Sequence, residues 1–280
     1  MSIGRAILWS SSLAALGLAV KSIWGEPPPL AYAVAALVGY LVVLGVLALA
    51  PRLEAFGDYL CHVPDAGDRV GLTFDDGPDP RTTPRVLDLL DARGQRATFF
   101  VLGWKVEAHP EIARDIQQRG HQLALHGYHH DRLYAFKTPA AVREDLRRCQ
   151  DAVERAAGVR PVLFRPPVGQ ASPRTFAGAK RAGVELVGWS VRPADGLRWS
   201  TSEQVAERVT RRLRSGAIVV LHDATEAGSE ADPREPPSLA ALPAILDAVA
   251  ARGLRSVTLE ELITAGDPGP PPEPRRSADA

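Results

Sequence analysis

The apolar and polar positions divide the chain into three parts. Two long apolar segments occupy the first 50 residues, alternating patterns fill residues 69–265, and a polar, proline-rich stretch covers residues 266–280. In the middle part, short apolar runs of strand length alternate with amphipathic segments of helical period. The pattern therefore predicts a membrane anchor, an α/β domain and a disordered tail.

The second apolar segment is the stronger candidate for a membrane span. Residues 30–50 contain no charged side chain over 21 residues, which is about the length needed to cross a bilayer. Tyr32 near one end and Arg52 just beyond the other are residue types that anchor spans at the interface. A buried core helix is the alternative, but such helices seldom run so long without a polar residue.

The first apolar segment is less clear. Residues 6–20 are uncharged but include three serines, with Arg5 before them and Lys21 after. If the Lys21 ammonium extends to the interface, the span can reach Trp24. A secretory signal peptide has a similar pattern, although no small-residue cleavage site follows Val20. We therefore expect two transmembrane helices within residues 1–51 and a juxtamembrane linker over residues 52–68.

Charge around the two spans bears on the side of the membrane that the domain faces. Two spans leave the N-terminus and the C-terminal domain on the same side. Arg5, Arg52 and Arg69 flank the open ends of this hairpin, whereas Lys21 alone lies between the spans. The open ends thus carry two more positive charges than the loop between the spans. By the positive-inside rule, this difference favours an integral protein of the cytoplasmic membrane whose domain faces the cytoplasm.

The middle part predicts a regular strand–helix alternation. Strands are expected at residues 69–74, 97–103, 121–127, 161–167, 184–191, 217–223 and 255–262. Helices are expected at residues 83–94, 109–120, 138–158, 172–183, 200–216 and 239–253. Such alternation is typical of a parallel α/β sheet, either open or closed into a barrel.

Composition narrows the functional classes. The chain has 33 basic and 33 acidic residues, so no overall positive charge favours nucleic acid as a partner. Its two cysteines, Cys61 and Cys149, lie far apart and form no CxxC pattern. A disulfide framework or a cysteine-ligated zinc site is therefore not expected.

Polar side chains follow the predicted strands in turn. Asp75, Asp76, His126, His129, His130, Arg165, Asp195 and His222 all come directly after or near the end of an apolar run. Because the carboxyl ends of parallel strands meet at one edge, we expect these side chains to lie together. The i, i+4 spacing of His126 and His130 suits two ligands of one metal ion, and an aspartate would complete a catalytic metal site. Taken alone, the histidine cluster also fits a polar surface loop, and His129 is expected to point elsewhere.

Four motifs carry a family resemblance. TFDDGP (73–78), HGYHH (126–130), RPPVG (165–169) and VVLHD (219–223), in this order and at these intervals, resemble the motifs of the NodB-type polysaccharide deacetylases, carbohydrate esterase family 4. The resemblance extends over roughly residues 69–263. It implies an α/β fold of the irregular (β/α) barrel type and a hydrolase of carbon–nitrogen bonds.

The resemblance also implies a role for each motif residue. Asp76, His126 and His130 would bind a divalent metal ion, zinc first, with cobalt or manganese as alternatives. Asp75 would be the general base that deprotonates the attacking water, and Arg165 would orient it and keep it ionised. His222, supported by Asp195, would protonate the departing amine, a step that amide hydrolysis requires because amines are poor leaving groups. Four residues are expected to contact the substrate: Leu221, Pro167, Tyr128 and Trp189. Of these, Leu221 would line the pocket for the acetyl methyl group.

The sequence departs from the family pattern in two places. Gly127 and Asp131 stand where Ser or Thr and Pro commonly follow the two histidines. Asp195 is followed by Gly196 rather than by tryptophan, so the nearest tryptophans are Trp189 and Trp199. The second departure affects the expected wall of the substrate groove more than the expected catalytic groups.

The function expected from these features is a membrane-anchored, metal-dependent deacetylase of an N-acetylated sugar. The substrate would be an N-acetylglucosamine-type unit in peptidoglycan or polysaccharide if the domain faces outward, and a lipid-linked precursor if it faces the cytoplasm. The expected partners are this glycan or lipid-linked sugar and membrane lipid, with no nucleic acid. A deformylase or other deacylase of a lipid-linked amino sugar remains an alternative, and so does a non-catalytic carbohydrate-binding barrel.

Overall fold

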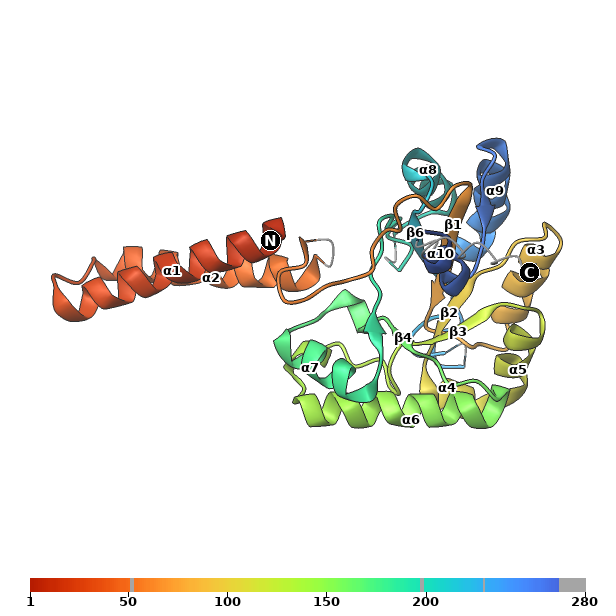
Figure 1. The fold of residues 1–280 in the computed structure, drawn as a ribbon, viewed down its shortest axis with the longest axis horizontal. Helices are drawn as coiled ribbons and strands as arrows, with labels where there is room; N and C mark the ends of the chain where they lie inside the picture. The colour runs from red at the N-terminus through yellow and green to blue at the C-terminus, as the bar shows by residue number, and fades with distance from the viewer. Residues whose placement is uncertain (51–52, 197–198, 229, 267–280) are drawn as a thin grey trace, which may run out of the picture.

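The computed structural model describes residues 1–50, 53–196, 199–228 and 230–266, so all but the first residue of the predicted tail (266–280) lies outside the described residues. Two long helices, α1 (Ile3–Trp24) and α2 (Leu30–Leu49), project as a hairpin from an α/β domain (Figure 1). The two expected apolar helices are thus present. Both are long and apolar enough to cross a membrane, a test that a signal sequence near the N-terminus also passes.

Within the described residues the domain is built on a parallel sheet of seven strands: β1 (Arg69–Asp75), β2 (Thr98–Val101), β3 (Gln122–Leu125), β4 (Leu163–Phe164), β5 (Glu185–Leu186), β6 (Ile218–His222) and β7 (Arg255–Ser256). The strand order is β5-β4-β3-β2-β1-β6, and β7 also pairs with β1. A single bridge between Val191 and Val219 joins the segment after β5 to β6. This bridge curls the sheet toward closure, and the predicted irregular (β/α) barrel is confirmed.

Helices cover the outside of the sheet (Figure 1): α3 (Thr83–Asp91), α4 (Gly103–Ala108), α5 (Pro110–Gln118), α6 (Pro139–Ala157), α7 (Pro173–Ala182), α8 (Ser202–Arg212) and α9 (Pro237–Ala251). The last helix, α10 (Leu259–Gly266), instead packs Leu259 and Leu262 against the inward-facing residues of the strands. Short 3-10 helices, η2 (Tyr134–Phe136) and η3 (Pro167–Gly169), lie in the loops after β3 and β4. The helix starts follow the capping residues of the sequence. Thr138 accepts a hydrogen bond from the Ala141 amide, and Thr201 and Gln204 form a capping box.

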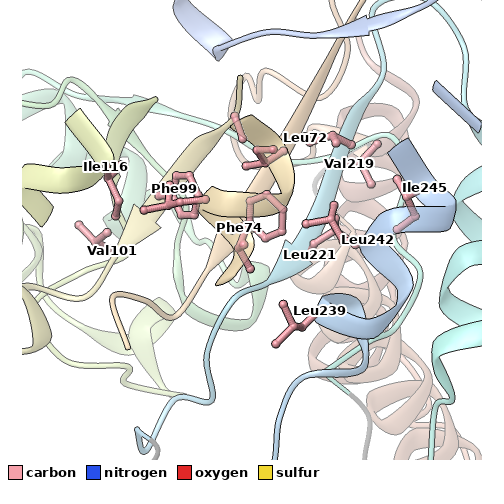
Figure 2. Close-up of a cluster of buried hydrophobic side chains, with 14 of the residues drawn as sticks. Leu72, Phe74, Phe99, Val101, Ile116, Val219, Leu221, Leu239, Leu242 and Ile245 are labelled. Carbon is pink, nitrogen blue, oxygen red and sulfur yellow. The ribbon is translucent and has the colours of Figure 1, made fainter. Parts of the chain in front are cut away.

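The main core lies between the sheet and its helices. Figure 2 shows Phe74 of β1 and Leu221 of β6 packed with Leu242 and Ile245 of α9. Burial of each such side chain contributes about 1.5–3 kcal/mol. Successive strand residues point to opposite faces. Asp75 and His222, the next residues along the two strands, therefore point to the inside of the barrel.

Three predicted strands differ from the structure, and one helix was not predicted. The strands expected at 161–167 and 184–191 are each only two residues long, at β4 and β5, and the second run adds two isolated bridges, at Val187 and Val191. The strand expected at 255–262 ends at Ser256, because Leu259 and Leu262 lie three residues apart and bury one face of α10. Helix α4, which begins where a strand was expected to end, was not predicted.

The predicted linker is in part a piece of the domain. Val63 and Ala66 are buried in the barrel core, and the Val63 amide donates a hydrogen bond to Gly216 O. The ordered domain therefore begins ahead of the predicted boundary at Arg69.

A buried histidine makes the stability of this domain pH-dependent. His121 accepts a hydrogen bond from the Ala97 amide, and burial lowers its pKa to about 4. The unfolded chain, in which a histidine pKa is about 6.5, takes up this proton first, so stability is lost as pH falls from about 6.5 toward 4. His121→Asn should reduce the loss of unfolding free energy between pH 7.5 and pH 5 by about 2 kcal/mol. Urea titrations of both proteins in detergent measure this difference, and equal losses in the two proteins would contradict the prediction.

Candidate active site

Loops at the carboxyl ends of the strands bring the predicted side chains together. Asp75 and His222 lie beside each other in the register of β1 and β6. Pairwise contacts place seven of the predicted residues in one cluster: Asp75, Asp76, His126, His130, Arg165, Asp195 and His222. His129, by contrast, is exposed, with its ring against Tyr128.

Asp76, His126 and His130 form a compact triad. One potential ligand atom from each lies within 4.8 Å of the other two. Nε2 of His126 is 3.5 Å and Nε2 of His130 is 3.6 Å from Oδ1 of Asp76. This oxygen is buried and receives no hydrogen bond within the described residues, which is costly unless a cation satisfies it. A carboxylate oxygen and two imidazole nitrogens fit zinc and similar divalent ions, so these residues could hold one.

The Nδ1 atoms of the two histidines, which face away from Asp76, also have close partners. Nδ1 of His126 lies 2.7 Å from Arg165 O, and Nδ1 of His130 lies 2.7 Å from Oε2 of Glu226. The contact with Arg165 O keeps a proton on Nδ1 of His126 and leaves its Nε2 free to bind a metal, whereas Glu226 lies close to Nδ1 of His130 without hydrogen-bond geometry. Glu226, which follows β6 and also pairs with Arg132, was not predicted from the sequence. The sequence signal that points to it is a carboxylate four residues after His222.

The backbone of Asp76 is also held in place. Its φ of 75° lies in the left-handed region, which is uncommon for residues other than glycine. Nζ of Lys105 donates hydrogen bonds to Asp76 O at 2.7 Å and to Thr225 O at 2.6 Å. This buried lysine therefore joins the β1 and β6 loops and supports an otherwise unfavourable conformation. No sequence motif pointed to Lys105.

Asp75 is paired with a fully buried arginine. Nη1 of Arg165 donates to Oδ1 of Asp75 at 2.6 Å and to Oγ1 of Thr73 at 2.7 Å, and Nη2 donates to Gly188 O at 2.9 Å. Burial raises the pKa of the Asp75 carboxyl, while the Arg165 and His222 charges oppose that shift. A carboxylate held rigidly, with its proton affinity raised by burial, is suited to act as a base.

His222 is paired with Asp195. Nδ1 of His222 lies 3.0 Å from Oδ1 of Asp195, and the His222 amide donates to Oδ2 at 2.8 Å. Burial alone lowers the pKa of His222, but the carboxylates of Asp195, Asp76 and Asp75 outweigh it and raise the pKa to about 10. These carboxylates therefore favour the charged, proton-donating form of the imidazole.

Two of the residues predicted to contact the substrate point away from the cluster. Leu221 is fully buried in the core under α9 (Figure 2). It lies on the opposite face of β6 from His222, the next residue along the strand. Val220, paired with Thr73 on β1, lies on the same face of the strand as His222. Tyr128 is 7% exposed, and its hydroxyl donates to Glu107 of α4. It packs away from the cluster because Arg148 of α6 stacks on its ring.

The other two predicted substrate contacts lie close to the cluster. The Trp189 ring is 5.8 Å from the Arg165 guanidinium, and a Cβ atom on Gly169 would come within 2.3 Å of that ring. Pro167 is buried at the start of η3, two residues after Arg165. Both therefore remain candidates for the wall of the site, without a contact that tests their roles.

Comparisons with known proteins agree with this geometry. The sequence profile described as polysaccharide deacetylase matches residues 62–187. A peptidoglycan-N-acetylglucosamine deacetylase of Bacillus cereus is 34% identical over 78% of this chain and 98% of its own length. A chitooligosaccharide deacetylase of Bradyrhizobium sp. is 38% identical over 58% of this chain and 73% of its own.

A solved structure is similar as well. A family 4 acetyl xylan esterase of Clostridium thermocellum, in complex with a cobalt ion, is 34% identical and superposes with a TM-score of 0.63, covering 70% of this chain and 90% of its own. The motifs, the barrel and these similarities agree. This chain therefore belongs to the polysaccharide deacetylase family, the NodB-type carbohydrate esterases of family 4.

Proposed function

We propose that the protein is a membrane-anchored, divalent-metal-dependent hydrolase that removes the acetyl group from an N-acetylated sugar. One observation supports this proposal most strongly. At one edge of the sheet, a carboxylate paired with arginine and an imidazole paired with aspartate lie beside a triad of two histidines and one aspartate. Amide hydrolysis needs these parts because the amide is a poor electrophile and the amine is a poor leaving group.

Asp76, His126 and His130 would hold the metal ion, with zinc as the first choice and cobalt or manganese as alternatives. A divalent ion in such a site supplies Lewis acidity, which acidifies water and polarises a carbonyl group. The cobalt ion in the related esterase supports a divalent ion without selecting zinc.

The protein's own residues would divide the proton transfers. Asp75 would take the proton of the attacking water, and the Arg165 guanidinium, 2.6 Å from it, would fix its position. His222 would donate a proton to the departing sugar nitrogen, and Asp195 would hold the imidazole in the orientation for that transfer. Both transfers face the same edge of the sheet, so one bound acetamide can meet base and acid together.

The named relatives support an N-acetylglucosamine-type unit as the substrate, in peptidoglycan, in a polysaccharide or on a lipid carrier. A deformylase or other deacylase of a lipid-linked amino sugar would use the same groups. A non-catalytic carbohydrate-binding barrel would be expected to lack at least one of these groups, and none of the predicted base, acid or metal-binding residues is missing.

Chelation and product analysis test this proposal. We expect purified protein to release acetate rather than formate from N-acetylated chitooligosaccharides. We also expect a chelator to stop this release and added zinc to restore it, because the triad would be emptied and refilled. Release that withstands thorough removal of metal would overturn the metal-dependent mechanism, and formate release would favour the deformylase.

The hairpin supports an integral anchor. The faces of α1 and α2 are largely exposed and apolar, and Oγ of Ser12 lies 3.0 Å from Oη of Tyr40 across the two helices. The charge bias described above favours a cytoplasmic domain. A C-terminal alkaline phosphatase fusion should then be inactive in cells, and an active fusion would assign the domain to the outside.

Glu226 should contribute to metal affinity through His130. Glu226→Ala removes the carboxylate that lies 2.7 Å from Nδ1 of His130, and loss of such a partner typically weakens metal binding 10–100-fold. Chelator competition measures the zinc dissociation constant of both proteins. Glu230→Ala, which removes an exposed carboxylate of the same loop, is the matched control. Equal affinity of Glu226→Ala and the control would show that Glu226 does not orient His130.

A further inference from the structure

Two large apolar side chains stand exposed on the loop that leaves the histidine motif. Leu133 and Phe136 are 63% and 73% exposed, while Tyr134 between them is buried. The Phe136 amide donates to Leu133 O, which closes the 3-10 turn of η2. Residues three apart in such a turn lie one above the other. Leu133 and Phe136, called the apolar tip below, therefore share one outward face.

The apolar tip is fixed to helix α7. Oγ of Ser172, the N-cap of α7, donates a hydrogen bond to Ala135 O of η2 at 2.7 Å. Farther along α7, the Phe176 ring packs edge-on against Tyr59, with ring centres 5.2 Å apart. Tyr59 lies in the segment that leads from the hairpin into the barrel.

The same segment contacts the base of the hairpin. Nη2 of Arg5 lies 2.5 Å from Oδ1 of Asp58, and Oγ of Ser2 donates to Glu54 O at 3.1 Å. A continuous series of contacts thus runs from the start of α1 through residues 54–59 and α7 to the apolar tip. Figure 1 shows α7 on the side of the barrel from which the hairpin projects.

We propose that the apolar tip inserts into the surface of the bilayer that the hairpin crosses, and that this contact selects a lipid-linked amino sugar as the substrate. The inference rests on the proposed membrane anchoring. Leucine and phenylalanine partition favourably into the acyl-chain boundary.

The apolar tip lies close to the triad in sequence, so its contact with the membrane would also position the triad. Leu133 follows His130 by three residues, so an inserted tip holds the triad beside the headgroups. A sugar attached to a membrane lipid is presented at that level, whereas a glycan strand away from the membrane is not. Membrane attachment also raises the effective concentration of such a substrate at the site.

The first experiment locates the apolar tip. In full-length Cys61→Ser protein, Phe136→Cys carries a bimane label, and Val162→Cys, at an exposed apolar position (56%) just before β4, is the matched control. Cys149 is fully buried and should not react. In vesicles of phosphatidylcholine and phosphatidylglycerol with brominated chains, we expect strong quenching at position 136 and none at 162. Equal fluorescence at both positions would overturn tip insertion. Recovery of the wild-type protein from cells without detergent would overturn the anchoring itself.

The second experiment tests substrate choice. Leu133→Ser/Phe136→Ser should lower turnover of polyprenyl-diphosphate-linked N-acetylglucosamine in vesicles at least about tenfold, while leaving turnover of a soluble N-acetylated chitooligosaccharide unchanged. Val162→Ser should change neither. Equal loss on both substrates would make the tip a sugar-binding surface and would overturn the proposal, as would no loss on either.

Discussion

Asp75→Asn is expected to lower kcat by about a thousandfold or more while the protein retains its metal. Asparagine keeps the shape of the side chain but accepts no proton, and general-base catalysis typically contributes 10²–10⁴-fold. Asp75 is not part of the triad, whose ligand atoms come from Asp76, His126 and His130. Steady-state acetate release and metal content per chain, measured on the same preparation, separate the two effects.

Folding must be controlled in this experiment. Asp75→Asn leaves the buried Arg165 guanidinium without its counter-charge, which destabilises the fold as well as the reaction. The unfolding temperature of the variant shows whether the protein tested is folded. Asp247→Asn, which changes a 67% exposed side-chain carboxylate on α9, should retain wild-type kcat. Metal loss in Asp75→Asn as great as in a ligand variant would mean that the roles of the two adjacent aspartates are wrongly assigned.

The order of strands and helices could be predicted because their hydrophobic periods differ and because glycine and capping residues mark the ends of the helices. The lengths of the short strands were predicted least accurately. Only two residues of β5 pair with β4, and the rest of the apolar run 184–191 makes isolated bridges, Val187 with Leu60 and Val191 with Val219. Periodicity shows that such a run is buried but does not show how many of its residues pair in the sheet.

The predicted side chains lie together where residues are close in sequence or end adjacent strands. His126 and His130 share one loop, and Asp75 and His222 end paired strands. Glu226 and Lys105 could not be predicted, because each reaches the site through a contact between distant parts of the chain. Leu221 was misassigned although its neighbour was known: with His222 facing the site, alternation along β6 already points Leu221 into the core.

The two departures from the family pattern have physical counterparts in the structure. Gly127 has a φ of 91°, a conformation that glycine adopts freely and that serine or threonine would find strained. A Cβ atom at Gly196 would lie 3.4 Å from the His222 ring. The residue that replaces the usual tryptophan therefore adjoins the proposed acid and presents no aromatic ring to it.

His126→Ala should remove both the metal and the activity. His126 would supply one of three protein ligands, and loss of an outer partner alone weakens metal affinity 10–100-fold. Loss of the ligand itself should therefore weaken zinc binding by at least about a hundredfold and abolish acetate release. Because His126 is buried, His130→Ala, with a side chain 9% exposed, provides a second ligand variant that is easier to accommodate.

His129→Ala is the matched control for both ligand variants, since His129 belongs to the same motif but is exposed and outside the triad. It should keep wild-type zinc affinity and turnover. Zinc content measured after dialysis against a chelator gives the comparison directly. Full zinc content in His126→Ala and His130→Ala would place the metal elsewhere, and zinc loss in His129→Ala would mean that the wrong histidine of the motif has been assigned. The i, i+4 pair is expected because only His126 and His130 direct Nε2 toward the buried oxygen of Asp76, at 3.5 Å and 3.6 Å.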